Sequence, residues 1–193
     1  MLKKLLSNGY FFKELPPCFK TTKYADIVFP ETGLVDIFNK ESKQAKSCVH
    51  NLARAGSLPR RLALVNPIPF FQLANYIASN WGSILPKINR SKLSLSVPSE
   101  KDDVNRAIVP KCNQPDLIEH RARVRVAHGA LLKADISQFY PSLYTHSIPW
   151  AIHGKKEAKS NRDDDLLGNK LDRLVRKGQD GQTLGIPVGP DTS

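Results

Sequence analysis

The chain has 193 residues, and its 29 Lys and Arg residues outnumber 18 Asp and Glu residues, for a formal net charge of +11 at pH 7. This length suffices for one good core or two small ones, and the charge favours a polyanionic partner, although solubility alone would also account for it. Its three scattered cysteines and short apolar runs argue against a disulfide framework, a zinc site, a signal peptide and a membrane span. We therefore expect a soluble cytoplasmic protein with free thiols and no membrane partner.

The N-terminal part of the chain, residues 1–90, is predicted to be a helical region. Residues 2–8 have the pattern of a short amphipathic helix. Apolar side chains recur at helical spacing in residues 40–55, which predicts a second helix. A third helix is predicted over residues 69–81, because Pro is favoured in a first turn and apolar residues follow at spacings of three and four.

A hairpin followed by a helix is predicted for residues 91–128. Residues 93–97 alternate between apolar and polar side chains, and residues 106–109 form a second candidate strand after a polar, turn-prone loop. Residues 114–126 have helical spacing with a basic side. Such a helix is suited to following the phosphate backbone of a nucleic acid.

The C-terminal part, residues 129–193, is predicted to begin with a buried strand that ends in one acid. Residues 131–136 carry the apolar run, and Pro141 ends it because proline cannot donate to a strand ladder. Asp135 is therefore expected at the C-terminal end of the strand. It is either a functional carboxylate or a residue that caps the next element or pairs with a basic neighbour.

Two more helices are predicted further along, over residues 147–153 and 166–177. The three acids at 163–165 precede the second helix, and we interpret them as capping residues, since adjacent acids on a helix point in different directions. His146 and His153 are interpreted as structural.

Two stretches resemble motifs of reverse transcriptases. Residues 135–142 read DISQFYPS, an acid after a predicted strand with the aromatic Tyr140 shortly after it, and this resembles the first catalytic motif of the family. Residues 185–193 read GIPVGPDTS, within a glycine-rich stretch that begins at Gln182 and resembles the motif that follows. The longer stretch 135–150 and the lead-in at 9–17 look most like the bacterial abortive-infection and phage-defence branch.

The resemblance implies an α/β (α+β) fold, a partial right-hand polymerase. Residues 1–90 would be its helical N-terminal region, residues 91–128 a fingers-like hairpin and helix, and residues 129–193 an incomplete palm. The implied activity is that of an RNA-directed DNA polymerase, a nucleotidyltransferase that uses two Mg²⁺ ions. The implied partners are RNA or DNA and deoxynucleoside triphosphates, with template and primer type left open.

The resemblance also assigns site residues. Asp135, with the backbone carbonyl of Ile136, would bind the Mg²⁺ ions. Tyr140 would lie under the sugar and exclude a 2′-hydroxyl group. Residues Gly185, Pro187 and Gly189 would line the nucleotide and template pocket. Arg106, with Lys101 or Lys92, would bind the triphosphate, because an Arg fork binds phosphate oxygens in pairs; solvated hairpin charges are the alternative.

Two departures from the family pattern bear on activity. Val188 stands where many members carry Gln. The third motif, an aromatic followed by paired Asp residues, does not occur up to Ser193. We therefore expect an N-terminal fragment, inactive alone, that needs its missing C-terminal portion or an oligomer partner. A catalytically dead remnant that binds nucleic acid, and an unrelated basic domain, are the alternatives.

Overall fold

The computed structural model describes residues 1–28, 38, 44–100, 106–161 and 166–193, and their fold is mixed α and β. Four strands form two antiparallel pairs, β1 (Cys48–Arg54) with β2 (Ser57–Leu64) and β3 (Pro98–Ser99) with β4 (Val109–Pro110). The described helices are α1 (Leu2–Asn8), α2 (Thr22–Val28), α4 (Pro67–Ser79), α5 (Trp81–Ile88), α6 (Gln114–Val126), α7 (Phe139–Ser142), α8 (Ser147–His153), α9 (Lys155–Ser160) and α10 (Leu167–Lys177). The coarse class, α+β, agrees with the prediction.

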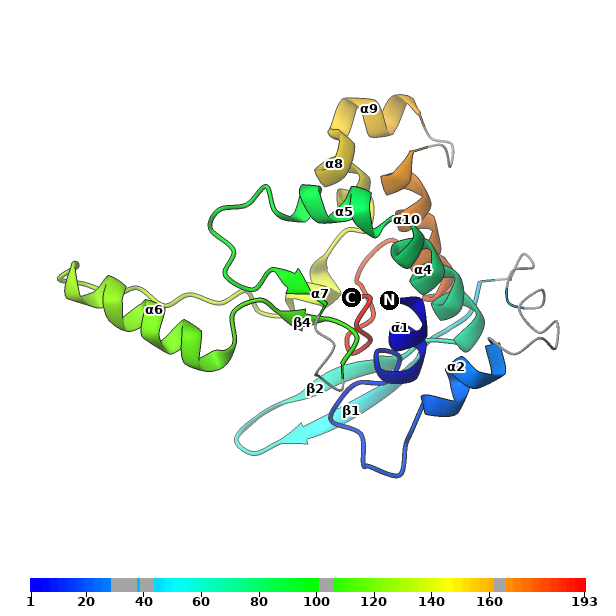
Figure 1. Ribbon diagram of the computed structural model, residues 1–193, viewed down its shortest axis with the longest axis horizontal. Coiled ribbons are helices and arrows are strands. Elements are labelled where there is room, and N and C mark those ends of the chain that lie inside the picture. Colours follow the sequence, from blue (N-terminus) through cyan, green and yellow to red (C-terminus); the bar gives the residue numbers. More distant parts are fainter. Residues whose placement is uncertain (29–37, 39–43, 101–105, 162–165) are drawn as a thin grey trace.

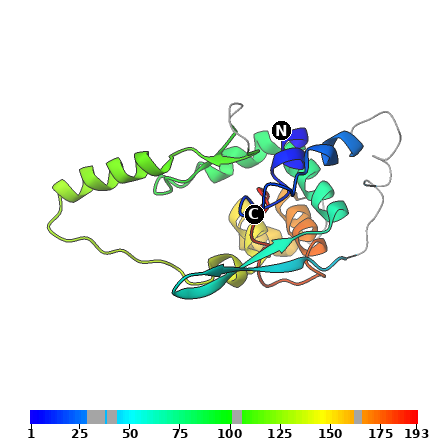
Figure 2. The same cartoon turned by 90° about the horizontal axis from the view of Figure 1, so that it is seen from below.

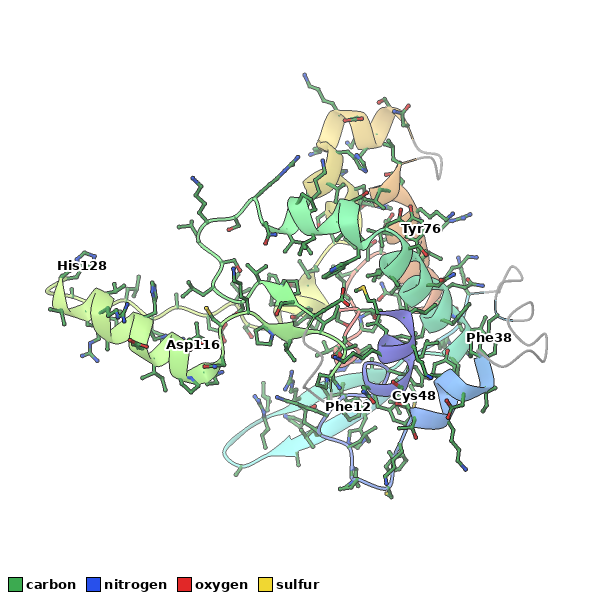
Figure 3. The ribbon with its side chains drawn as sticks, viewed as in Figure 1. Phe12, Phe38, Cys48, Tyr76, Asp116 and His128 are labelled. Atoms are coloured by element: carbon green, nitrogen blue, oxygen red, sulfur yellow. The ribbon has the colours of Figure 1, made fainter. Side chains whose placement is uncertain are left out.

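Two elements project from a helical body (Figures 1 and 2). One is the β1–β2 hairpin. The other is an arm made of α6 and residues 127–138, which return the chain from the tip of α6 to α7. Figure 3 shows Asp116 and His128 near the two ends of this arm's helix, with side chains pointing outward around it, and α6 buries none of its residues. The arm therefore adds nothing to the core.

The first core cluster joins α1, α2 and α4. Leu5, Leu6 and Phe70 are fully buried there, and the Tyr10 ring lies 4.6 Å from the Phe70 ring between centroids. The Tyr10 hydroxyl donates to the Val65 carbonyl over 2.6 Å. Because this hydroxyl has a partner, the aromatic ring is buried without an unsatisfied polar group.

The second core cluster joins α4, α5, α8 and α10. Its buried members are Leu73, Ile84, Leu171, Leu174 and Val175. Helix α4 contributes to both clusters, so it ties the N-terminal helices to the C-terminal ones. Helices α8 and α10 approach so closely that a Cβ at Gly168 would lie 2.6 Å from the Cα of Pro149. Glycine is therefore needed at this helix contact.

Five predicted helices are confirmed. They are α1, α4, α6, α8 and α10; the predicted helix over residues 69–81 starts at Pro67 and breaks at Asn80, so that Trp81 belongs to α5. No helix among the described residues is long and apolar enough to cross a membrane. The acids at 163–165 lie outside the described residues.

The predicted helix over residues 40–55 is wrong in its described part, which is irregular up to Ser47 and then forms strand β1. Strand β1 pairs with β2 in antiparallel register, with Val49 opposite Ala63, and Gly56 turns the chain at φ 68°. Both faces of β1 are largely exposed, so the strand carries no clear alternation of apolar and polar residues. Pairing with a partner strand overrides the helical spacing.

The predicted buried strand over residues 131–136 is also wrong. The segment has no regular structure, and Leu131, Leu132 and Ile136 are 61%, 92% and 65% exposed. A strand needs a neighbour to pair its backbone N–H and C=O groups, and no strand of the described residues pairs with this segment. Apolar composition alone has not made a strand here.

The hairpin predicted over residues 93–109 is much shorter than expected. Pro98 and Ser99 pair with Pro110 and Val109, and one further hydrogen bond runs from the Lys111 amide to the Val97 carbonyl over 2.7 Å. Leu93 is 94% exposed, so its side chain does not pack on an apolar surface at the start of the predicted strand. An antiparallel pair therefore exists in this region, but β3 lies just after residues 93–97, in the predicted loop, and each strand has two residues.

Candidate functional site

The two stretches that resemble catalytic motifs meet in the structure. The Ile186 amide donates to the Tyr140 carbonyl over 2.9 Å, and the Gly185 amide donates to the Leu143 carbonyl over 2.7 Å. The Thr145 amide donates to the Thr183 carbonyl over 2.8 Å. Residues 139–145 and 183–186, here called the motif junction, are thus joined by backbone hydrogen bonds.

Local backbone geometry makes this junction possible. Gln138 adopts a left-handed conformation at φ 52°, which turns the chain from the arm into the short helix α7. Gly185 has φ +89°, and a Cβ there would lie 3.2 Å from the Pro141 carbonyl oxygen. Only glycine combines that dihedral angle with such a close approach at little cost. The glycine of the second motif therefore has a structural reason for being in the junction.

A cavity of about 510 Å³ lies beside the junction, and we call it the junction cavity. The glycine-rich segment and the β1–β2 hairpin enclose it, and the Ala63 amide holds them together by donating to the Val188 carbonyl over 2.8 Å. The residues that give the cavity its chemistry are Lys46, Arg61, Pro141, Gln182, Gly185 and Pro187. Its volume is in the range of small-molecule sites.

Two cationic side chains reach this cavity, from the hairpin and from the residues just before it. Arg61 is exposed, and Lys46 lies 3.8 Å from the carboxylate of Asp180 in a solvent-exposed pair. Exposed ion pairs of this length are weak, so the Lys46 ammonium group can move toward an anion. The cavity is thus lined by two cationic side chains and one carboxylate, Asp180, next to apolar contacts from Pro187 and Leu184.

The glycine-rich segment is anchored on its other side by Arg106. The guanidinium group of Arg106 binds the Asp191 carboxylate and donates to the Phe11 carbonyl over 2.7 Å. Asp191 also accepts from the amides of Ala107 and Ile108, at 3.0 and 3.2 Å. Burial raises the pKa of Asp191, and the Arg106 charge and these amide hydrogen bonds oppose that rise. Arg106 therefore fastens the N-terminal segment to the glycine-rich segment.

Gly189 belongs to the same anchor. It has φ +135°, and a Cβ there would lie 2.9 Å from the Cβ of Phe12. Phe12 is buried, is marked in Figure 3, and stacks on His50 of strand β1 with ring centroids 5.6 Å apart. Gly189 thus allows the glycine-rich segment to pass close to the N-terminal segment.

The residues expected to bind magnesium lie elsewhere. Asp135 and Ile136 belong to the exposed segment of the arm, whereas Tyr140 is part of the junction and 39% exposed. Among the described residues, no group of three or more His, Cys, Asp or Glu side chains could hold a metal ion. The described residues therefore do not fit the two-ion site that the resemblance implies, because such a site needs several oxygen ligands.

The sequence-predicted site residues fall into two sets. Tyr140, Gly185 and Pro187 come together at the junction or its cavity. Asp135, Ile136, Arg106 and Gly189 do not line that cavity, and Lys101 lies outside the described residues. No protein-family model and no curated protein matches the chain. Function is therefore inferred below from the motifs and the geometry of the chain itself.

Sequence reasoning missed the hairpin residue Arg61 and the neighbouring Lys46. The signal for Arg61 was present: Gly56 is a turn residue, and the apolar residues of 62–65 follow a basic pair. Reading residues 40–55 as a helix left that apolar run without a partner. The hairpin became visible only through the pairing of β1 with β2.

Proposed function

We propose that the chain binds a deoxynucleoside triphosphate and a nucleic-acid strand as part of an RNA-directed DNA polymerase of the bacterial phage-defence type. One observation carries the proposal: two stretches selected by sequence resemblance alone are joined by backbone hydrogen bonds at the motif junction. The resemblance rests on residue identity and the junction on geometry, so the two supports are independent.

The junction cavity is the proposed nucleotide site. Arg61 and Lys46 bind the phosphate groups, since the Arg fork matches pairs of phosphate oxygens and Lys adds a point charge. Pro187 and Leu184 supply apolar contact to the base. Tyr140 precedes the cavity-lining Pro141 and fixes the sugar end of the site. The β1–β2 hairpin takes the phosphate-binding role that the sequence assigned to residues 91–128.

The net charge of +11 supports the second half of the proposal, which is nucleic-acid binding. Binding through phosphate groups releases counterions, so the affinity for a strand falls steeply as the salt concentration rises. The basic helix α6 buries none of its residues and carries the exposed Arg121, Arg123 and Arg125. It offers a surface for the phosphate backbone.

Magnesium would activate the primer hydroxyl and neutralise phosphate charge in this reaction. Because the described residues do not gather the ligands for it, no catalytic step is assigned and the proposal concerns substrate binding. The second candidate function is nucleic-acid binding without catalysis. It is favoured by the exposed position of Asp135, the acid to which the resemblance gives the catalytic role.

The test is a binding titration with a deoxynucleoside triphosphate and, separately, with a labelled single-stranded oligonucleotide at several salt concentrations. The double variant Lys46→Gln and Arg61→Gln removes the two cavity cations, and we expect its affinity for the nucleotide to fall by about tenfold or more. The matched control, Lys20→Gln and Lys23→Gln, removes two exposed charges outside the cavity and leaves that affinity within about twofold.

Equal losses in the two double variants would mean that nucleotide binding follows net charge and not the junction cavity. An affinity for the oligonucleotide that does not change with salt would remove the nucleic-acid half of the proposal.

A further inference from the structure

A second cavity, of about 590 Å³, lies between helices α8, α9 and α10 and is called the helix cavity. In Figure 1, α8 and α9 lie at the end of the molecule opposite the β1–β2 hairpin. Its lining includes the aromatic residues Tyr144 and Trp150 and basic residues of α9 and α10. The polymerase resemblance gives no role to these basic residues.

Four cationic side chains converge on this cavity. Lys155 and Lys159 are one helical turn apart on α9, and Arg173 and Arg176 are one turn apart on α10. Among the described residues that line the cavity, Asp172 is the one carboxylate, so cationic side chains outnumber it there. Several convergent cationic side chains suit a multiply charged anion, because its charges can interact with more than one of them.

Arg176, one of these cations, is held in place by the buried Asp172. Asp172 is 4% exposed, and its Oδ2 atom lies 3.3 Å from Nε of Arg176 and 2.6 Å from Nδ1 of His146. A buried carboxylate that binds both groups restricts the rotamers of each. Arg176 is therefore oriented before any ligand arrives, which lowers the ordering entropy that a ligand would otherwise have to overcome.

The aromatic side of the cavity is suited to a base. Tyr144 and Trp150 have ring centroids 5.6 Å apart, and the Lys155 ammonium lies 4.9 Å from the Trp150 ring centroid. Tyr144 is 42% exposed, so part of its surface is open to solvent. Exposed aromatic rings beside basic side chains form the combination by which proteins bind single-stranded nucleic acids.

We propose that the helix cavity binds phosphate groups attached to a nucleobase, either those of a free nucleotide or those of a nucleic-acid strand. Lys155, Lys159, Arg173 and Arg176 bind the phosphate oxygens, and Tyr144 or Trp150 contacts the base. This site is separate from the junction cavity, although Tyr144 also pairs with Leu184 in the motif junction. It does not depend on the polymerase function proposed above.

Tryptophan fluorescence tests this site directly. Trp150 lines the helix cavity, whereas Trp81 packs against the second core cluster, so the variant Trp81→Phe leaves Trp150 as the only tryptophan. We expect saturable quenching when adenosine triphosphate or a short oligothymidylate is added. Tripolyphosphate, which has no base, is expected to compete with both ligands. If only the oligothymidylate quenches, the site binds strands; if both quench, it also takes free nucleotides.

A matched pair of lysines on α9 gives the control. Lys159→Gln removes a cavity charge, and we expect about five- to tenfold weaker binding, whereas Lys159→Arg keeps the charge and the affinity. Lys156→Gln makes the same change at an exposed α9 residue that does not line the cavity, and affinity stays within about twofold. Absence of saturation, or equal losses at residues 156 and 159, overturns the proposal.

The double variant Lys46→Gln and Arg61→Gln separates the two proposals. It alters the junction cavity alone, so quenching of Trp150 is expected to be unchanged in it. Quenching lost in that variant as well would mean that Trp150 reports the junction cavity, and the helix cavity would not be a site of its own.

Discussion

The two halves of residues 131–145, a segment that includes the first motif, differ sharply in structure. Residues 131–136 are exposed and irregular, whereas residues 139–145 are fixed to the glycine-rich segment by three backbone hydrogen bonds. The exposed half is the more apolar of the two, so composition does not explain the difference. The difference is explained by hydrogen-bonding partners from elsewhere in the chain. An extended segment needs such partners for the backbone groups on its open edges.

The largest effect on the motif junction is expected where Gly185 approaches the backbone of Pro141. Gly185→Val places a β-branched side chain at φ +89°, where even a Cβ would lie 3.2 Å from the Pro141 carbonyl oxygen. We expect a loss of about 2–4 kcal/mol in the free energy of unfolding, measured by urea denaturation, together with loss of nucleotide binding. Gly82→Val, at a helical glycine with open space around it, is the control and stays within about 1 kcal/mol.

A smaller loss is expected where the glycine-rich segment is held from its other side. Asp191→Asn replaces a carboxylate oxygen with an N–H donor close to the Arg106 guanidinium and the amides of Ala107 and Ile108. We expect a loss of about 1–3 kcal/mol in the free energy of unfolding. Asp180→Asn makes the same chemical change in an exposed acid with φ 57°, a conformation that Asn tolerates, so little change is expected. Equal losses at both positions would contradict the anchor.

Substitution of Tyr140 tests the fixed half without a large change in the free energy of unfolding, because this residue is 39% exposed. If it fixes the sugar end of the junction cavity, Tyr140→Ala lowers the preference for deoxyribonucleotide over ribonucleotide triphosphates in binding by about tenfold. Tyr140→Phe keeps the ring and the preference. A ratio that is the same in the wild type and both variants would show that another residue contacts the sugar.

The smallest effect is expected in the exposed half of this segment. Leu132 is 92% exposed, so Leu132→Ser changes the free energy of unfolding by no more than about 0.5 kcal/mol. Leu62, which is 1% exposed in β2, is the contrast: Leu62→Ser loses about 2–5 kcal/mol because it removes buried apolar surface and buries a hydroxyl. A large loss at Leu132 would mean that residues 131–136 are packed after all.

Local patterns predicted five of the nine described helices. In α4 and α10 the apolar stripe, Pro67 at the start of one and Gly178 at the end of the other all lie within a few turns, so the sequence specifies them without reference to distant residues. Strand β1 escaped prediction because its partner, β2, determines it and because its two faces are almost equally exposed. Strand pairing is a tertiary property.

The residues of the candidate site were likewise predicted only in part. The motif residues Tyr140, Gly185 and Pro187 were found by resemblance, since each stands in a short recognisable stretch. Arg61 was missed because its role depends on the packing of a hairpin against the glycine-rich segment. His146 was expected to be structural, and its partner Asp172 could be named only from the contact of α8 with α10. These pairings depend on contacts between secondary-structure elements, which the periodicity of a single element does not specify.

Hydrogen exchange measured with and without a deoxynucleoside triphosphate tests most directly whether the motif junction is a nucleotide site. Binding in the junction cavity predicts slower exchange of amides in residues 61–63 and 183–188, and no change in residues 131–136 of the arm. Nucleotide that binds without protecting residues 183–188 would contradict the account.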